Sequence, residues 1–217
     1  MAKPTAIIYV DGLNLYRQCL SGKPELKWLD LQKLCEYMLP THQIVSIRYF
    51  TSIIKQPIGN PSAPLRQRMY LRALEAYAPR LTIHLGTMRF DTKRYRKVPL
   101  EFDPLGKPVL VKVQKLEEKG TDVSLASHMV FDAAINPADL HVLISSDGDF
   151  APTISQLRDS LSVGVAILAP SNYLARPLLE SKPHLIRTIH RDALKKSQLP
   201  TEIELQKGFV RRPAVWS

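Results

Sequence analysis

The sequence contains few cysteines and no long run of apolar residues. Cys19 and Cys35 are too few for a disulfide framework and lack the spacing of a metal site. No stretch approaches the roughly 18 consecutive apolar residues of a membrane span, and the N-terminus MAKPTAIIYVDG lacks the layout of a signal peptide. We therefore expect a reduced, cytoplasmic protein that does not bind membranes.

Several motifs of catalytic sites are also missing. The sequence has no G-x-S-x-G elbow to present a nucleophilic serine and no G-x-x-x-x-G-K-[ST] loop to bind nucleotide phosphates. The histidines are scattered, and none pairs with another at the helical spacing of metal ligands. Serine-hydrolase chemistry, P-loop nucleotide binding and a histidine-based metal site are therefore not expected.

The overall composition is that of a folded, basic protein. Hydrophobic residues make up 45% of the 217 residues and charged residues 23%, which supports one globular core and argues against disorder. The net charge is +10, from 30 Lys and Arg against 20 Asp and Glu. This balance favours an anionic partner without identifying it.

Short apolar runs rich in β-branched residues alternate with helical patterns. The runs that predict strands are residues 5–10, 44–53, 81–88, 140–145, 163–168 and, more weakly, 184–190. The patterns that predict helices are residues 29–38, 65–77, 123–134 and 150–157; in the third, Val123, Ala126, Val130 and Ala133 form an apolar stripe. This alternation predicts an α/β fold with a mainly parallel central sheet and helices on both faces.

Two regions interrupt the alternation. Residues 89–113 contain three prolines and a glycine among charged residues, which predicts a basic insertion or irregular hairpin. Residues 191–217 show little periodicity and predict a basic C-terminal tail that is extended or flexible. We therefore expect one domain over residues 1–190, followed by this tail.

Three aspartates follow predicted strands. Asp11 follows the first strand, and Asp147 and Asp149 follow the strand at 140–145. Ligands of open parallel sheets bind at the carboxyl ends of the strands, where the strand order reverses. If these two strands are neighbours at such a point, Asp11 and Asp147 face one crevice, which Asp122 can reach from the start of a helix.

Carboxylates gathered in one crevice repel each other, and a divalent cation removes this conflict. Ligand sets made only of oxygen favour Mg²⁺ or Mn²⁺. Such an ion can activate water and neutralise charge that develops on a phosphate. The aspartates therefore predict metal-dependent cleavage of a phosphodiester.

Each of these residues also has a purely structural explanation. Asp is common at turns and helix N-termini because its side chain accepts backbone hydrogen bonds. Asn14 can steer a carboxylate or a metal-bound water, or it can cap a helix. Ser145 can donate its hydroxyl to the same network, or it can simply end its strand.

Three sequence motifs resemble a known family. They are YVDGLNLY (9–16), EEKGTDVSLASHMV (117–130) and LISSDGDFAPTISQLR (143–158), followed by GVAIL. In this order they resemble the NYN domain, in the LabA-like branch of the PIN-like nuclease superfamily, over about residues 5–170. The resemblance implies a PIN-like (Rossmann-like) fold and cleavage of RNA, so that residues 1–190 form a NYN/PIN-like nuclease domain.

The resemblance also implies roles for the motif residues. It makes Asp11, Asp122, Asp147 and Asp149 the metal ligands and adds Asn14 to the catalytic set, with Ser145 as a supporting residue. The chain departs from the family pattern in the last motif. Ser146 stands where glycine is expected and Gly148 where serine is usual, so that a hydroxyl has moved by two positions.

Basic residues are expected to hold the RNA. In the insertion they are interleaved with Phe90 and Tyr95, a mixture that suits phosphates and stacked bases but also suits a solvated loop. The candidates are Arg66, Arg68, Arg72, Arg89, Lys93, Arg94, Arg96, Lys97, Lys112, Lys115 and Lys119.

Two other functions fit part of the pattern. A phosphatase of the haloacid dehalogenase type also places aspartates after strands, but its second aspartate would stand at the position of Leu13. A catalytically silent RNA-binding or regulatory module would retain the acidic pocket without turnover. The apolar Leu and Tyr residues on the helices are compatible with a homo-oligomer and equally with core packing.

Overall fold

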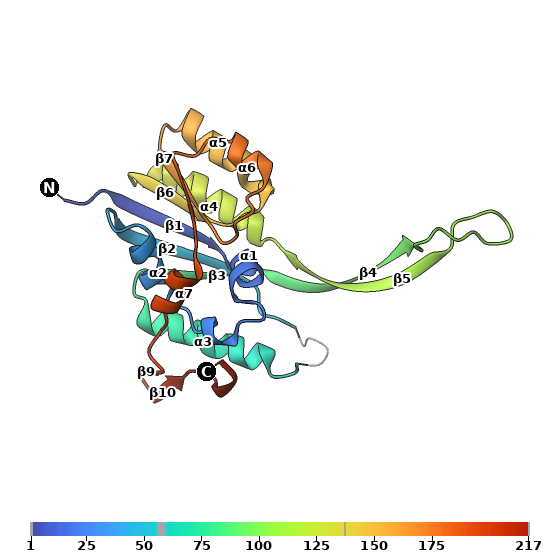
Figure 1. Cartoon of the computed structure of the whole chain (residues 1–217), viewed down its shortest axis with the longest axis horizontal. Helices are drawn as coiled ribbons and strands as arrows, with labels where there is room; N and C mark the ends of the chain where they lie inside the picture. The colour runs from blue at the N-terminus through green and yellow to red at the C-terminus, as the bar shows by residue number, and fades with distance from the viewer. Residues whose placement is uncertain (1, 56–59, 137, 217) are drawn as a thin grey trace.

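The computed structural model describes residues 2–55, 60–136 and 138–216 and contains a central sheet of parallel strands (Figure 1). The strands are β1 (Thr5–Asp11), β2 (Gln43–Thr51), β3 (Leu81–Leu85), β6 (Leu140–Ile144), β7 (Gly164–Ala169) and β8 (Leu185–Thr188). They lie in the order β3-β2-β1-β6-β7-β8, and each neighbouring pair is parallel. The predicted α/β fold is confirmed.

Helices cover both faces of this sheet. The described helices are α1 (Gly12–Leu15), which continues into a π-helical turn over Tyr16–Leu20, α2 (Leu31–Met38), α3 (Ala63–Tyr77), α4 (Thr121–Ile135), α5 (Ala151–Ser160), α6 (Arg176–Glu180) and α7 (Arg191–Lys196). In the part of the chain that the structure describes, no helix is long and apolar enough to cross a membrane.

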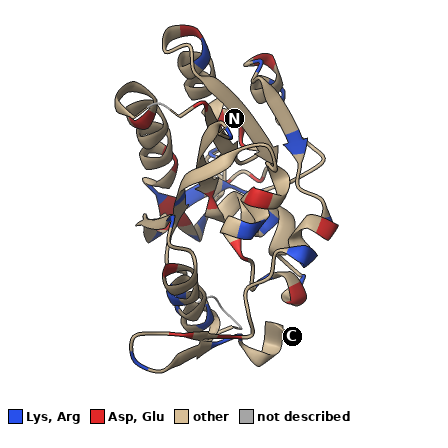
Figure 2. Ribbon diagram, turned by 90° about the vertical axis from the view of Figure 1, so that its left-hand side faces the viewer, with Lys and Arg blue, Asp and Glu red and all other residues tan. Residues whose placement is uncertain are grey.

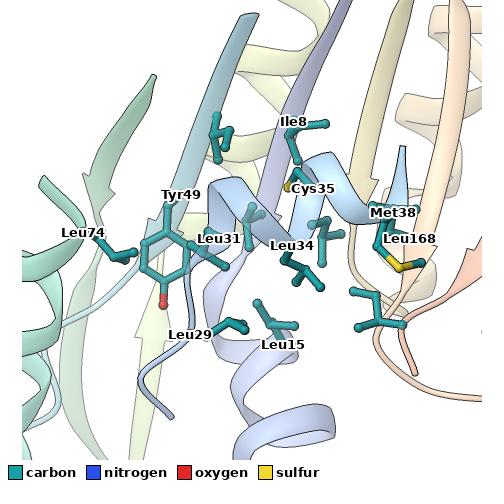
Figure 3. Close-up of a cluster of buried hydrophobic side chains, with 14 of the residues drawn as sticks. Ile8, Leu15, Leu29, Leu31, Leu34, Cys35, Met38, Tyr49, Leu74 and Leu168 are labelled. Carbon is teal, nitrogen blue, oxygen red and sulfur yellow. The ribbon is translucent and has the colours of Figure 1, made fainter. Parts of the chain in front are cut away.

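Alternate residues of β1 enter two different cores. Ala6, Ile8 and Val10 pack with α2, α3 and α7, whereas Ile7 and Tyr9 pack with α4 and α5. Figure 3 shows the first core, in which the apolar side of α2 faces the sheet. Successive side chains of a strand point to opposite faces, so a β1 that is apolar throughout can serve both layers.

The buried face of α4 differs from the predicted stripe. Leu125, Met129 and Ala133 are buried against the sheet, whereas Val123 is 73% exposed. The predicted stripe is therefore wrong at Val123. Because the helix is apolar around much of its circumference, its sequence alone does not select the packed side.

The insertion is a regular β-ribbon. Strands β4 (Thr87–Arg96) and β5 (Leu110–Lys119) pair antiparallel without a bulge and project from the body of the domain (Figure 1). The expected irregular hairpin over 89–113 is corrected in two ways, because the strands are regular and they extend beyond both limits. The prolines that suggested irregularity all fall in the connection between the strands.

The C-terminal residues belong to the core. After α7, strands β9 (Glu202–Glu204) and β10 (Phe209–Arg211) form a small antiparallel pair. Ala193, Leu194, Ile203 and Val210 are buried in the first core, and Trp28 Nε1 donates a 2.7 Å hydrogen bond to the carbonyl of Pro200. The expectation of an extended or flexible tail is wrong. The sequence did not show the docking of this segment because its few buried apolar residues are widely spaced and form no periodic pattern.

An ion pair between the half-buried Arg48 of β2 and the buried Asp132 ties the sheet to α4. Asp132 is 3% exposed and accepts hydrogen bonds from Arg48 Nε and Nη2, at 2.6 and 2.7 Å, and from the Tyr9 hydroxyl at 2.9 Å. The same hydroxyl lies 3.1 Å from His141 Nδ1. Arg48 and Tyr9 therefore share one hydrogen-bond acceptor, the carboxylate of Asp132.

We expect Asp132→Ala to lower the free energy of unfolding by about 2 kcal/mol, because it leaves the half-buried guanidinium of Arg48 and the buried hydroxyl of Tyr9 without their acceptor. Urea unfolding measures this change. Asp159→Ala is the control, since its pairing with the neighbouring Arg158 is exposed, and it should cost less than about 1 kcal/mol. Equal losses of unfolding free energy in the two variants would contradict the stabilising role given to Asp132.

Candidate functional site

The site lies where the strand order reverses. β1 and β6 are neighbours in the sheet, with Val10 opposite Ile144, and the chain leads away from them in opposite directions across the sheet. Asp11 is the last residue of β1, and Ser145, Ser146 and Asp147 directly follow β6. This edge is the usual ligand-binding edge of open parallel sheets.

Asp11 is buried and held on both oxygens. Its Oδ1 accepts the backbone N–H of Asn14 at 2.9 Å, and its Oδ2 accepts the Ser145 hydroxyl at 3.0 Å. Asp11 is therefore the N-cap of α1, a role that the sequence had left open for Asn14. Gly12 is required here, because a Cβ would lie 2.6 Å from Cε2 of Tyr49 on β2.

Asn14 holds the loop after β6. Its Oδ1 accepts the backbone N–H of Ser146 at 3.2 Å and the Ser146 hydroxyl at 3.1 Å. The Ser145 hydroxyl accepts the backbone N–H of Asp147 at 3.1 Å, and Asp147 Oδ1 accepts the backbone N–H of Asp149 at 3.0 Å. These bonds connect the first and last sequence motifs directly.

The two departures from the family pattern both have a structural reason. The hydroxyl at Ser146 is the one that binds Asn14. A Cβ at Gly148 would lie 3.2 Å from Cβ of Ala175 and 3.5 Å from Cγ of Pro177, at the start of α6. A serine at position 148 would therefore crowd α6, so the loop carries its hydroxyl at 146.

Three of the four predicted aspartates line one polar cleft. Asp11 reaches it from β1, Asp122 from the first turn of α4 and Asp147 from the loop after β6. Asp149 is exposed and lies outside the lining, although its negative charge helps to raise the pKa of Asp122. Asn14 also lines the cleft, whereas Ser145 is buried behind Asp11.

Two carboxylates of the cleft, Asp11 and Asp122, have raised pKa values. Burial raises the pKa of Asp11 to about 6 against the two hydrogen bonds it accepts, and the charges of Asp122 and Glu118 act in the same direction as burial. Desolvation raises the pKa of Asp122, followed by the charges of Asp147, Glu118 and Asp149. Among the described residues none of Asp11, Asp122 and Asp147 forms an ion pair.

The cations around the cleft are engaged elsewhere or lie at its rim. Lys115 and Lys119, which the sequence predicts as RNA contacts, line it, but both pair with Glu117, at 3.3 and 2.7 Å. Hydrogen bonds from these lysines lower the pKa of Glu117 to about 2. The acidic centre therefore keeps uncompensated negative charge.

Two lining residues were missed by the sequence analysis. Arg17 stands three residues after Asn14, one residue beyond the first motif, and Glu118 stands four residues before Asp122 in the second motif. The only sequence signal for their presence in the cleft was their position next to the motif residues. Glu118 acts on the pKa values of both Asp11 and Asp122, so it belongs to the electrostatics of the site.

The remaining predicted basic residues are spread out. Arg68 and Arg72 are exposed on α3 and do not line this cleft. Arg66, also on α3, lines a second pocket that lies beside the cleft and is described below. The side of the molecule in Figure 2 shows Lys and Arg scattered among Asp and Glu. The ribbon carries Arg89, Lys93, Arg94, Arg96, Lys112 and, at its end, Lys97.

A second, more apolar pocket shares a wall with the aspartate cleft. Leu13 and Glu118 line both cavities. The second pocket is also lined by Tyr49 of β2, Tyr70 of α3 and Trp216 near the C-terminus. We call it the aromatic pocket.

The donor chemistry of the cleft suits a hard divalent cation. Its ligands would be carboxylate oxygens whose charges are uncompensated, which is the situation that Mg²⁺ or Mn²⁺ relieves. Over residues 2–55, 60–136 and 138–216, however, no three His, Cys, Asp or Glu side chains already converge into a metal-binding group. The oxygen donors are present in one cleft but are not gathered at one point.

A parallel sheet of this strand order, with a carboxylate-lined cleft at the point of reversal, defines an open α/β domain of the Rossmann-like kind. The NYN domain family matches residues 5–189, and the chain belongs to this family, whose fold is of the RNase type. Membership agrees with the three motifs.

Two further similarities add to this finding. The chain is 28% identical to 6-hydroxy-3-succinoylpyridine 3-monooxygenase HspA of Pseudomonas putida, over 96% of this chain and 74% of the relative. The fold of the present chain is similar to that of a protein of unknown function from Vibrio parahaemolyticus. The TM-score is 0.57 and the identity 17%, over 88% of this chain and 95% of the other.

Proposed function

We propose that this protein is a metal-dependent endoribonuclease of the LabA-like branch of the NYN family. The observation that carries the proposal is the cleft that Asp11, Asp122 and Asp147 line from three elements, without an ion pair among the described residues. The site-residue roles taken from the sequence are part of the same proposal.

Asp11, Asp122 and Asp147 would hold Mg²⁺ or Mn²⁺, and Asp149 would join them from the edge of the cleft or orient the attacking water. When bound, the ion supplies charge neutralisation at the phosphate and a water of lowered pKa. Ser145 and Asn14 act as positioning residues through the hydrogen bonds that they make to Asp11 and Ser146. Arg17 at the rim would bind a phosphate group of the RNA.

The two faces of the β4–β5 ribbon support different roles. On one face, Lys93 pairs with Asp91 at 2.9 Å and with Glu117 at 3.8 Å, and Glu117 also pairs with Lys115. On this face the charges of Lys93 and Lys115 are therefore paired with carboxylates, whereas Arg89 forms no ion pair among the described residues. Lys97, at the end of the ribbon, is likewise paired with Glu101 at 2.5 Å.

The other face of the ribbon carries unpaired positive charge. Arg94 lies opposite Lys112, Arg96 opposite Leu110, and Phe90 projects from the same face at even spacing. Among the described carboxylates, none lies within ion-pair distance of Arg94, Arg96 or Lys112. Like charges directly opposite each other are destabilising unless an anion joins them, which favours this face as the RNA contact.

We expect the double change Arg94→Thr and Lys112→Thr to weaken binding of single-stranded RNA about tenfold at low salt. It should also reduce the slope of log K against log salt by about 1.4, since each phosphate contact contributes about 0.7. Fluorescence anisotropy over a salt series measures both. The matched control is Lys93→Thr with Lys97→Thr, since both of these lysines are paired with carboxylates. Equal effects of the two double changes would contradict the assignment of RNA binding to the Arg94 and Lys112 face.

Incubation of the purified protein with single-stranded and structured RNAs, in Mg²⁺, Mn²⁺ or chelator, tests the proposed function. We expect internal cleavage that the chelator abolishes, visible as products from RNAs with both ends blocked. RNA binding without cleavage in any metal would favour a catalytically silent RNA-binding module. Hydrolysis limited to small phosphate esters would favour a phosphatase.

A second candidate is oxygenation of an aromatic heterocycle. The Pseudomonas putida relative is named as a monooxygenase of a substituted pyridine, and the similarity extends over 96% of this chain. The aromatic pocket beside the cleft is the observation that favours this candidate. Oxygen uptake with 6-hydroxy-3-succinoylpyridine and a reductant, in the absence of RNA cleavage, would support it over the nuclease.

A further inference from the structure

The aromatic pocket combines flat side chains with unfilled space. Tyr49, Tyr70 and Trp216 line it from β2, α3 and the C-terminal turn, and the rings of Tyr70 and Trp216 lie 6.3 Å apart in an edge-on arrangement. The pocket contains about 860 Å³ that protein atoms do not fill, part of it open to solvent. Its walls suit a planar ring.

Two polar atoms in this wall have no hydrogen-bond partner among the described residues. They are Glu118 Oε1 and Ser52 Oγ, and both atoms are buried. A buried polar atom without a partner is costly, so a ligand that supplies donors is favoured over a purely apolar one. The N–H groups of a heteroaromatic ring would serve the carboxylate of Glu118.

Two cations also line the pocket. Lys27 Nζ lies 5.4 Å from the centre of the Tyr16 ring, and Arg66 donates a 2.5 Å hydrogen bond to the side chain of Asn60. Neither cation pairs with a carboxylate in the described part of the chain. The pocket therefore suits a planar ring with N–H donors that is attached to an anionic group.

We propose that the aromatic pocket binds one base of the RNA, unstacked from its neighbours and adjacent to the phosphodiester in the aspartate cleft. This inference rests on the proposed nuclease function. It follows from the shared wall, because Leu13 and Glu118 line both cavities, so a nucleotide with its base in one has its phosphate beside the other. Guanine, whose N1–H and amino group can both donate to Glu118, binds better than uracil, which has only its N3–H to donate.

The test measures binding of GMP, UMP and ribose 5-phosphate by calorimetry, with chelator present and in the Asp147→Asn background so that cleavage does not interfere. We expect GMP to bind at least about tenfold more tightly than ribose 5-phosphate, which lacks the base, and more tightly than UMP. Equal binding of GMP and ribose 5-phosphate would overturn the inference.

Trp216→Ala should remove this base-dependent difference, and Trp216→Phe should retain most of it. Tyr37→Ala is the control, since Tyr37 is 48% exposed on α2 and lines neither cavity. If Trp216→Ala does not fold, Trp216→Leu provides the same test without an aromatic ring. Retention of the GMP preference in a folded variant without the ring would overturn the inference.

The inference and the proposed function can fail separately. RNA cleavage by the wild type without base-dependent binding of GMP would overturn only the inference. Base-dependent binding without cleavage would overturn only the nuclease. Binding of 6-hydroxy-3-succinoylpyridine that depends on Trp216 and exceeds that of GMP would overturn the base as the occupant and assign the pocket to a free heteroaromatic acid.

Discussion

Replacing Asp147 with Asn is expected to lower the rate of RNA cleavage by about a hundredfold to a thousandfold. The amide keeps an oxygen that can accept the backbone N–H of Asp149, so the loop should keep its shape. It removes a negative charge from the cleft, and charge stabilisation by a bound ion is worth several kcal/mol. Single-turnover cleavage of a labelled RNA at saturating Mg²⁺ measures the change.

Asp139→Asn is the matched control for this experiment. Asp139 lies just before β6, at the opposite end of the strand from Asp147, and binds Thr5. The same chemical change there should leave the rate within about twofold, since it is remote from the charge that develops in the reaction. Equal cleavage by the wild type and Asp147→Asn would show that the site is wrong.

Replacing Asp11 with Asn is expected to abolish cleavage and yet stabilise the protein at neutral pH. Burial raises the pKa of Asp11 to about 6, whereas an unfolded aspartate has a pKa of about 3.9. The folded state therefore binds a proton more tightly, and wild-type stability falls as pH rises from about 4 to about 6. The neutral Asn avoids this loss, so above pH 6 in chelator its free energy of unfolding should exceed that of the wild type by about 3 kcal/mol.

Urea unfolding of the wild type and Asp11→Asn at pH 3.5 and pH 7.5, with chelator, tests this sign. The difference should be near zero at the lower pH, where Asp11 is protonated in both states. Asp139→Asn gives the opposite control, because hydrogen bonds from Thr5 lower the pKa of Asp139 and its loss should destabilise at neutral pH. A destabilised Asp11→Asn at pH 7.5 would contradict the assignment.

Much of the fold could be predicted because strands β1, β6 and β7 of the central sheet are buried on both faces and therefore appear in the sequence as continuous apolar runs. Each of the six runs predicted as strands contributes one strand to the central sheet, although the run at 81–88 divides at Gly86, and its last residues begin β4 of the ribbon. The ribbon and the C-terminal elements were mistaken for irregular segments. Their strands are exposed or carry few apolar residues, so their stability comes from pairing and docking that leave little periodicity.

The candidate site was predictable to the extent that its residues follow strands or begin a helix. Asp11, Asp122 and Asp147 meet in one cleft, as the sequence suggested. Asp149 stays at its edge, and Glu118 enters because β5 runs alongside the cleft. The basic residues of the ribbon look equivalent in sequence, but strand register puts the carboxylate-paired Lys93 and Lys115 on one face and Arg94, Arg96 and Lys112, which form no ion pair among the described residues, on the other.

The sequence by itself determined that aspartates stand at or just after the ends of two strands and in the first turn of a helix. Asp is favoured at such positions whatever the packing around them. The tertiary structure decided which of these carboxylates share a cleft, because that depends on β1 and β6 being neighbours across the reversal of strand order. It also decided that the aromatic pocket lies beside them. Tyr49, Tyr70 and Trp216 are far apart along the chain, and only packing between β2, α3 and the C-terminal residues brings them together.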